Sequence, residues 1–307
     1  MNKTVRSALI IIMLCVATIA IIKFALSSFS VDENSYVSAS VDKENVLKRT
    51  KSPKVIFAGG SNLALGLNSK LLSTMVERPV VNMGLHAGLG LDFALNQAKL
   101  NVRKGDILIL SIEHFLSKGN NKLMAQLVSN NPSSYNLLNL TLGDKIRLFF
   151  AQLQLDISST FYKIIGRSRD PYYYRSAFTE AGDVISHYGK PKPSVVSGNI
   201  NFPLQDYSKE IETLNCFITY CASKGAKSYF IFPAFYKSAY LRNRVVLHDL
   251  ENQYKAKLHC PIIGTLEQSI YEDNYFFDTV YHLDSLGVQK RTIQVFELLK
   301  KNNVIKP

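Results

Sequence analysis

From residue 54 onward, short apolar runs alternate with segments that have one apolar face. The first runs cover residues 54–58, 79–82 and 107–110, and glycines follow or precede each of them. Residues 91–102 lie between two runs and carry apolar side chains at helical spacing. Fully apolar strands separated by amphipathic helices are typical of a parallel sheet that helices cover on both faces. The pattern therefore predicts an α/β fold.

The alternation stops over about residues 116–203 and then returns. This interruption contains a predicted helix over residues 142–165 and a polar, aromatic stretch over residues 167–175. After it, the pattern predicts further elements over residues 206–224, 228–232, 237–257, 261–263 and 286–301. Residues 54–307 are therefore expected to form one domain, in which the insertion builds a wall of a binding site over the sheet edge.

The N-terminal segment predicts where this domain resides. Residues 1–7 contain two basic side chains and no acid, and residues 8–22 are uncharged. With Lys23 snorkelling at the far interface, the span reaches about 19 residues, enough for a helix to cross a bilayer. Residues 8–26 are expected to anchor the chain once in the cytoplasmic (inner) membrane, with the N-terminus inside and the domain periplasmic or extracytoplasmic. A cleaved signal peptide is the alternative.

Charge and composition narrow the partners. The chain has 36 Lys and Arg against 24 Asp and Glu, a formal charge of +12, which suits an anionic lipid or glycan surface. Nucleic acid is a poor fit outside the cytoplasm. Residues 27–53 are polar and rich in serine, which favours a solvated linker, with a basic patch on anionic lipid as the alternative. A hydrophobic content of 47% excludes a wholly disordered chain.

The cysteines do not suggest a disulfide scaffold or a zinc ribbon. The chain has four of them and no Cys-x-x-Cys motif. Cys15 lies in the apolar span, which leaves three outside the membrane. Either one disulfide, with Cys221–Cys260 preferred, or three free thiols agrees with the sequence.

Nucleotide-cofactor and metal motifs are also missing from the sequence. A dinucleotide fingerprint that began at Gly88 and Gly90 would need a third glycine where Phe93 stands. No metal-ligand spacing stands out either. Neither a cofactor nor a metal is therefore expected.

Three short motifs carry residues that suit acyl chemistry. Ser61 follows two glycines at the end of the first strand, where ligands bind in open α/β folds, although a serine there also serves as a helix cap. Gly84 follows the second strand, and its N–H can approach a ligand closely because no Cβ intervenes. His282 precedes the last helix, and Asp278 stands four residues before it. Such a pair suits a general base whose imidazole is oriented by a carboxylate.

In this order the motifs resemble those of the SGNH (GDSL-like) hydrolase superfamily, particularly its membrane-anchored branches linked to acylation of bacterial surface polymers. The resemblance covers roughly residues 54–302 without the insertion. It implies a flavodoxin-like, three-layer αβα sandwich with a mainly parallel sheet. It further implies Ser61 as nucleophile, His282 with Asp278 as base, and the N–H groups of Ser61 and Gly84 as oxyanion hole.

The sequence departs from this family in two places. Where the family has an asparagine after the third strand, this chain has Glu113, and a carboxylate donates a hydrogen bond only when protonated. Asn62 or Asn82 is the nearest replacement donor in sequence, and Glu113 is a candidate pocket residue. The family spacing is Asp-x-x-His, whereas Asp278 stands one position further away, and Asp284 follows the histidine too closely to be preferred.

The sequence thus predicts an extracytoplasmic esterase or O-acyltransferase that acts on a cell-envelope glycan by a Ser-His(-Asp) mechanism. Its expected partners are the membrane, the glycan or an acyl donor, and a membrane acyltransferase. One alternative is a catalytically inactive SGNH-like module that binds glycan or a partner. Another is a substrate-binding or assembly protein of a secretion system. Hydrolysis and transfer stay open, because no sequence feature shows whether water is excluded.

Overall fold

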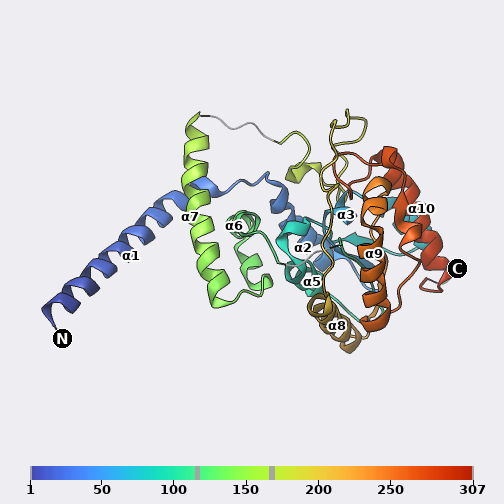
Figure 1. The fold of residues 1–307 in the computed structure, drawn as a ribbon, viewed down its shortest axis with the longest axis horizontal. Coiled ribbons are helices and arrows are strands. Elements are labelled where there is room, and N and C mark those ends of the chain that lie inside the picture. The colour runs from blue at the N-terminus through green and yellow to red at the C-terminus, as the bar shows by residue number, and fades with distance from the viewer. Residues whose placement is uncertain (1, 115–117, 166–169, 306–307) are drawn as a thin grey trace.

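The computed structural model of this 307-residue chain describes residues 2–114, 118–165 and 170–305. Figure 1 shows an α/β body from which the first helix, α1 (Lys3–Ser30), extends outward. Two helices of the insertion, α6 (Asn121–Asn130) and α7 (Leu142–Ile165), lie between α1 and the body. Positions 167–169 of the polar, aromatic stretch lie outside the described residues.

A parallel sheet of four strands forms the centre of the body. The strands are β1 (Val55–Gly59), β2 (Val80–Asn82), β3 (Ile107–Ser111) and β4 (Lys227–Phe230), in the order β2-β1-β3-β4. They coincide with four of the predicted apolar runs, because residues that are apolar on both faces suit a strand covered on both sides. The α/β class with a mainly parallel sheet is therefore confirmed. The fifth run, residues 261–263, contributes only an isolated bridge between Phe230 and Ile262.

Helices cover both faces of this sheet. Because successive strand residues point to opposite faces, Ile56 and Leu108 pack in one apolar cluster and Val55 and Ile107 in another. The helices of the first cluster are α5 (Leu91–Lys99), α8 (Ser208–Ser223) and α9 (Lys237–Lys257). Those of the second are α4 (Ser69–Val76) and α10 (Ser285–Lys301).

The remaining elements are short. The strands β5 (Phe235–Tyr236) and β6 (Ile270–Tyr271) form a second parallel pair. One-turn helices are α3 (Ser61–Ala64), η1 (Tyr36–Ser38), η2 (Ala87–Leu89), η4 (Arg175–Ala177), η5 (Glu267–Ser269) and η6 (Asp273–Tyr275), and η3 (Pro132–Leu137) is longer.

The segment after α1 is not a solvated linker, so this prediction for residues 27–53 is wrong for much of its length. The helix α2 (Ala39–Arg49) folds against the body, and Leu47 is fully buried. Lys43 is buried as well, and its Nζ donates to two backbone carbonyls, at 2.9 and 2.7 Å. The sequence pattern was misleading because the buried apolar residues of this segment are spread over two short helices and form no continuous run.

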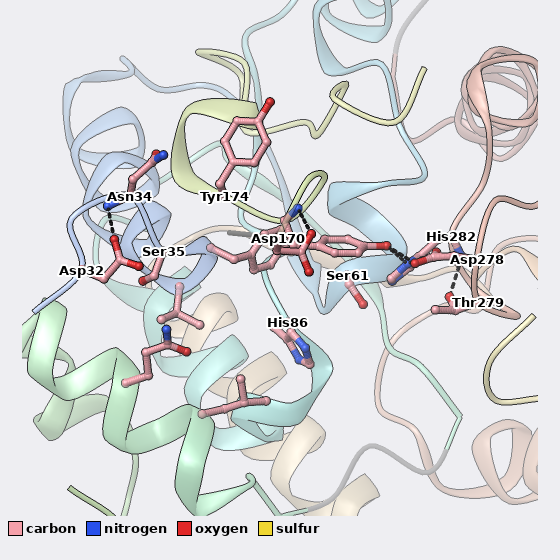
Figure 2. Close-up of a pocket in the computed structure, with 15 residues that line it drawn as sticks. Asp32, Asn34, Ser35, Ser61, His86, Asp170, Tyr174, Asp278, Thr279 and His282 are labelled. Atoms are coloured by element: carbon pink, nitrogen blue, oxygen red, sulfur yellow. Dashed lines mark hydrogen bonds and ion pairs between the residues drawn. The ribbon is translucent and has the colours of Figure 1, made fainter. Parts of the chain in front are cut away.

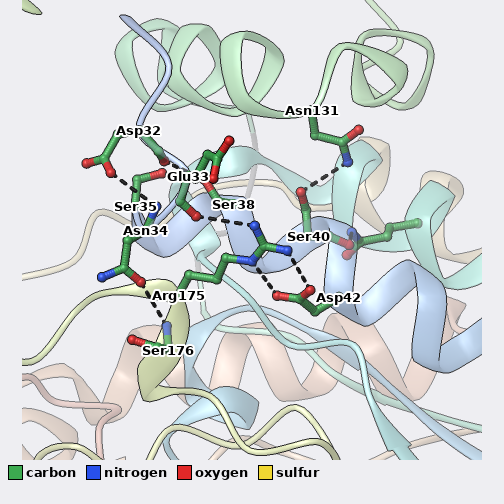
Figure 3. A network of polar contacts seen from close by, with 11 residues as sticks. Asp32, Glu33, Asn34, Ser35, Ser38, Ser40, Asp42, Asn131, Arg175 and Ser176 are labelled. Atoms are coloured by element: carbon green, nitrogen blue, oxygen red, sulfur yellow. Dashed lines mark hydrogen bonds and ion pairs between the residues drawn. The ribbon is translucent and has the colours of Figure 1, made fainter.

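An arginine of the insertion forms hydrogen bonds with this segment (Figure 3). The guanidinium of Arg175 donates to both carboxylate oxygens of Asp42, at 2.6 and 2.7 Å, and to the carbonyl of Glu33 at 3.3 Å. Such two-pronged pairs fix geometry as well as charge. The insertion and the segment that leaves α1 are therefore joined directly.

The helix α1 is long and apolar enough to cross a membrane over Lys3–Ser27. From residue 3 to residue 22 nearly all of its side chains are exposed; Ile12, for example, is 58% exposed. All four cysteines are free, so the Cys221–Cys260 disulfide is not formed. Burial raises the pKa of Cys221 to about 11 and that of Cys260 to about 12, which keeps both as unreactive thiols.

Candidate active site

A cavity of about 650 Å³ lies at the carboxyl end of β1, and Ser61, Asp278 and His282 all line it. Ser61 is the first residue of α3, directly beyond the strand, whereas the other two belong to the loop before α10. Figure 2 shows the three side chains on the same side of this cavity. Two motifs at opposite ends of the domain sequence therefore meet at one edge of the sheet, as the sequence predicts.

Asp278 and His282 form a hydrogen-bonded pair, with 2.9 Å between Oδ1 and Nδ1. Because a carboxylate only accepts, Nδ1 carries the proton, and in the neutral ring Nε2 keeps its lone pair. The four-residue spacing works because the loop folds back: the N–H of Phe277 donates to the carbonyl of His282 at 2.8 Å. Asp284 has another role, since it caps α10 by accepting the N–H of Gly287 at 2.8 Å.

Tyr173, which belongs to the insertion, contacts both members of this pair. Its hydroxyl donates to Oδ2 of Asp278 and lies 3.0 Å from Nδ1 of His282. Burial, together with the hydrogen bond to Asp278, raises the pKa of Tyr173 and keeps its hydroxyl protonated. Burial alone would raise the pKa of Asp278, but the hydrogen bonds from His282 and Tyr173 outweigh it and hold this pKa below its ordinary value. Asp278 is therefore held as a carboxylate.

Glu113 packs against the Ser61 turn and does not line the cavity, so its prediction as a pocket residue is wrong. Its carboxylate accepts the N–H groups of Gly60, at 3.1 Å, and Asn62, at 2.9 Å, on either side of the serine. A Cβ at Gly60 would lie 2.3 Å from this carboxylate, which explains why a glycine precedes Ser61. Burial raises the pKa of Glu113, although the bonds from Asn62 oppose this. Glu113 fixes the turn that presents Ser61.

The other predicted oxyanion donors are engaged elsewhere. The N–H of Gly84 donates to Oδ1 of Asn82 at 2.9 Å, and the Asn82 amide donates to the carbonyl of Leu63 at 2.8 Å. The amide of Asn62 donates to the last carbonyl of β3 at 3.0 Å. None of these donors lines the cavity. They form hydrogen bonds with buried polar groups near the strand ends instead. Of the predicted donors, only Ser61 lies at the cavity.

His86 lines the cavity and offers a donor that sequence reasoning missed. Its Nδ1 accepts the N–H of Gly88 at 2.9 Å, so the proton of the neutral ring is on Nε2. Burial, assisted by the nearby charge of His282, lowers the pKa of His86 to about 4. The ring of Tyr36 packs edge-on against it, with 6.2 Å between centroids. The His-x-Gly spacing after β2 was a signal that could have drawn attention to this residue.

One group of side chains in the described ranges could hold a metal ion, and it lies outside the cavity lining. His248, Glu251 and Glu267 each bring a ligand atom within 4.8 Å of the others. Glu251 already accepts from Nζ of Lys255 at 2.9 Å and lies 3.4 Å from Nδ1 of His248. The group is therefore satisfied as an ion-pair cluster.

No model of a known protein family matches this chain, and a search among curated proteins gives no match either. Membership of the SGNH superfamily therefore stays a prediction from the motifs. The function must be inferred from the chemistry of the cavity.

Proposed function

We propose that this chain is a serine-dependent acyl-ester enzyme of SGNH type with a flavodoxin-like αβα domain. In this proposal α1 anchors it in the cytoplasmic membrane, the domain lies outside, and the enzyme acts on a cell-envelope glycan, either by removing its acyl groups or by adding them from an acyl donor. The observation that carries the proposal is the meeting of Ser61 with the Asp278–His282 pair in one cavity. A nucleophile beside an oriented imidazole base is the arrangement that acyl transfer through serine requires.

The proposed reaction has two halves. Oγ of Ser61 attacks the acyl carbonyl carbon while its proton passes to Nε2 of His282, and the carboxylate of Asp278 stabilises the resulting imidazolium. The tetrahedral intermediate then breaks its bond to the alcohol of the donor, which leaves with the proton from Nε2. The acyl group now esterifies Ser61. Water or a sugar hydroxyl repeats these steps on the acyl-enzyme, which gives hydrolysis or transfer.

The oxyanion of each intermediate needs donors, and we assign this role to the N–H of Ser61 and to Nε2–H of His86. A neutral imidazole with its proton on the nitrogen away from Gly88 donates a hydrogen bond without needing reorganisation. His86 thereby takes the place of the asparagine that this chain lacks.

The second candidate function is an inactive module that binds glycan or a protein partner. The observation that favours it is the engagement of Gly84, Asn62 and Asn82 in structural hydrogen bonds. In addition, the imidazole of His282 bonds Asp278 and Tyr173 in the described structure, and no hydrogen bond joins it to Ser61. Catalytic hydrogen bonds often tighten only when substrate binds, so this geometry is compatible with both functions.

A covalent probe separates the two candidates. The full chain in detergent micelles is treated with a fluorophosphonate, which reports an activated serine whether or not water accepts the acyl group. We expect labelling on the peptide that contains Ser61, and its loss by about 10³-fold or more in Ser61→Ala. Ser223→Ala is the matched control, because Ser223 is exposed at the end of α8, does not line the cavity, and donates its hydroxyl to the Tyr220 carbonyl at 2.7 Å.

Absence of labelling in the wild-type chain, or labelling that persists in Ser61→Ala, would favour the binding module. If Ser61 is labelled, turnover of p-nitrophenyl acetate then separates the two reactions. A hydrolase turns over in water alone, whereas a transferase stops after one acylation until an acceptor sugar is added.

A further inference from the structure

The helix α7 presents a continuous apolar stripe to solvent. Its members recur at helical spacing and are each more than half exposed: Leu142 76%, Ile146 52%, Phe150 57%, Ile157 53%, Phe161 58% and Ile165 59%. Three of them, Phe150, Ile157 and Phe161, border a shallow apolar groove along the helix together with Leu153. The opposite side of α7 packs on the body through Leu148 and Leu155. The stripe is therefore not needed for the core.

Charges are missing from the middle of this helix. Between Arg147 and Lys163 the only charged residue is Asp156, and it is buried. Basic side chains stand near both ends of the stripe: Lys145 and Arg147 lie in its first two turns, where Arg147 pairs with Asp144 at 2.6 Å, and Lys163 lies in its last turn. A soluble protein surface rarely exposes such an apolar stretch without a partner. An apolar face with basic residues at its ends is typical of a helix that lies in a membrane interface.

The position of α7 relative to α1 identifies the partner. Nζ of Lys23 lies 3.4 Å from the buried carboxylate of Asp156 and 5.7 Å from the ring centroid of Phe149. Lys23 is the first charge after the uncharged run of residues 8–22, so it marks the level at which α1 leaves the apolar core of a bilayer. Figure 1 shows that α7 crosses α1 rather than continuing its direction.

We propose that α7 lies in the outer interface of the bilayer that α1 crosses, with its apolar stripe facing the acyl chains and its basic ends at the headgroups. This inference rests on the proposed membrane anchor. The bilayer is the occupant, rather than a second copy of the chain, because Lys23 joins α7 to α1 at the level where that helix emerges from the bilayer. Membrane lipid is present there without recruitment of any other molecule.

The arrangement also places the cavity close to the membrane surface. The helix α6 packs against α7, and its residues Leu123 and Gln126 line the cavity. Residues 32 and 34–37, which follow α1 closely, contribute to the same lining. A substrate or acyl donor held at the lipid surface would therefore approach the cavity from the side of α6 and of the segment that follows α1.

The absence of tryptophan from the chain allows a direct test, because one introduced indole is then the only one that emits. Single variants Phe150→Trp and Ile157→Trp of the full chain are placed in lipid nanodiscs with one copy per disc. Ile12→Trp in α1 reports the bilayer core, and Val245→Trp on α9, which is 80% exposed, is the matched solvent control. Lipids brominated on the acyl chains are expected to quench the indole emission of the two α7 variants at least about twofold and to leave that of the α9 variant unchanged.

Each alternative outcome overturns the proposal in a recognisable way. Emission from positions 150 and 157 that matches position 245 in both lipids means that the stripe stays in water. A blue-shifted emission that bromine does not quench, and that appears only with two copies per disc, means that a second chain covers it. Loss of quenching at position 12 as well means that the anchor itself is wrong. None of these readouts depends on activity, so they are independent of the catalytic proposal.

Discussion

Two walls of the cavity are built by different means. The sheet-edge wall, made by Ser61, His86, Asp278 and His282, stands on turns that follow strands or precede α10. The insertion wall, made by α6 and the residues around Tyr173, is held by side-chain packing and by contacts with the segment after α1. Hydrogen-bonded strands fix positions more tightly than packed loops do, so chemistry is expected from the first wall and selectivity from the second.

Among substitutions in the two walls, the largest loss of acylation rate is expected at His86 in the sheet-edge wall. His86→Phe removes the proposed Nε2–H donor, and the rate of Ser61 acylation should fall by about 10²-fold, with little change in substrate affinity. Single-turnover acylation by p-nitrophenyl acetate measures this rate. His86→Gln, which retains a side-chain N–H, should recover part of it.

His259→Phe is the control for this substitution, because that histidine is exposed and does not belong to the cavity lining. If His86→Phe acylates as fast as the wild type, the oxyanion is stabilised by another donor. The sheet-edge wall would then carry the nucleophile and base alone.

The second prediction concerns how the folding stability of the domain responds to acid. His114 directly follows Glu113, its Nδ1 lies 3.0 Å from the Tyr281 hydroxyl, and burial lowers its pKa to about 3. The unfolded chain therefore binds a proton here below about pH 6.5, whereas the folded chain does not until about pH 3. Stability should fall as the pH decreases through this window. From about pH 7 to about pH 4.5, His114 should account for about 2 kcal/mol of that loss.

Urea unfolding followed by circular dichroism measures the difference, and His114→Gln is the comparison, because an amide keeps a partner for Tyr281 without titrating. The variant should lose about 2 kcal/mol less than the wild type over the same range. An equal loss in both chains would mean that other groups determine the acid response. Burial also lowers the pKa of His187 in the insertion, so the comparison with His114→Gln is what isolates the share of the group that follows Glu113.

Hydrophobic periodicity within single segments was sufficient to predict the main helices and strands of the molecule. The helices over residues 142–165 and 237–257 occur with the predicted bounds, because their apolar spacing is encoded within the segment itself. The proximity of Ser61 to His282 was also predictable, since strand ends in a parallel sheet share one edge. These inferences needed only the periodicity of the chain and a topological rule.

What could not be predicted depends on contacts between distant segments. Tyr173 reaches Asp278 across 105 positions of sequence, and nothing near the tyrosine indicates which carboxylate it meets. The Asn82 amide likewise donates to the carbonyl of Leu63, 19 positions away, and to the carboxylate of Asp183, 101 positions away, and these partners appear only when the fold brings the segments together. Hydrogen-bond satisfaction is a property of the folded neighbourhood, so motifs that look like free donors in sequence become structural ones.

The smallest effect tests whether the insertion wall takes any part in the chemistry. Tyr173→Phe removes the hydroxyl that donates to Asp278 and should lower the acylation rate about tenfold. Because that bond helps to hold the pKa of Asp278 down, its loss should raise this pKa and move the acid limb of the pH–rate profile to higher pH. Tyr174→Phe is the control, because Tyr174 lines the same cavity but is not bonded to the Asp278–His282 pair. A packing role alone would lower the rate equally in both variants and leave the acid limb in place, and the two walls would then be fully separate in function.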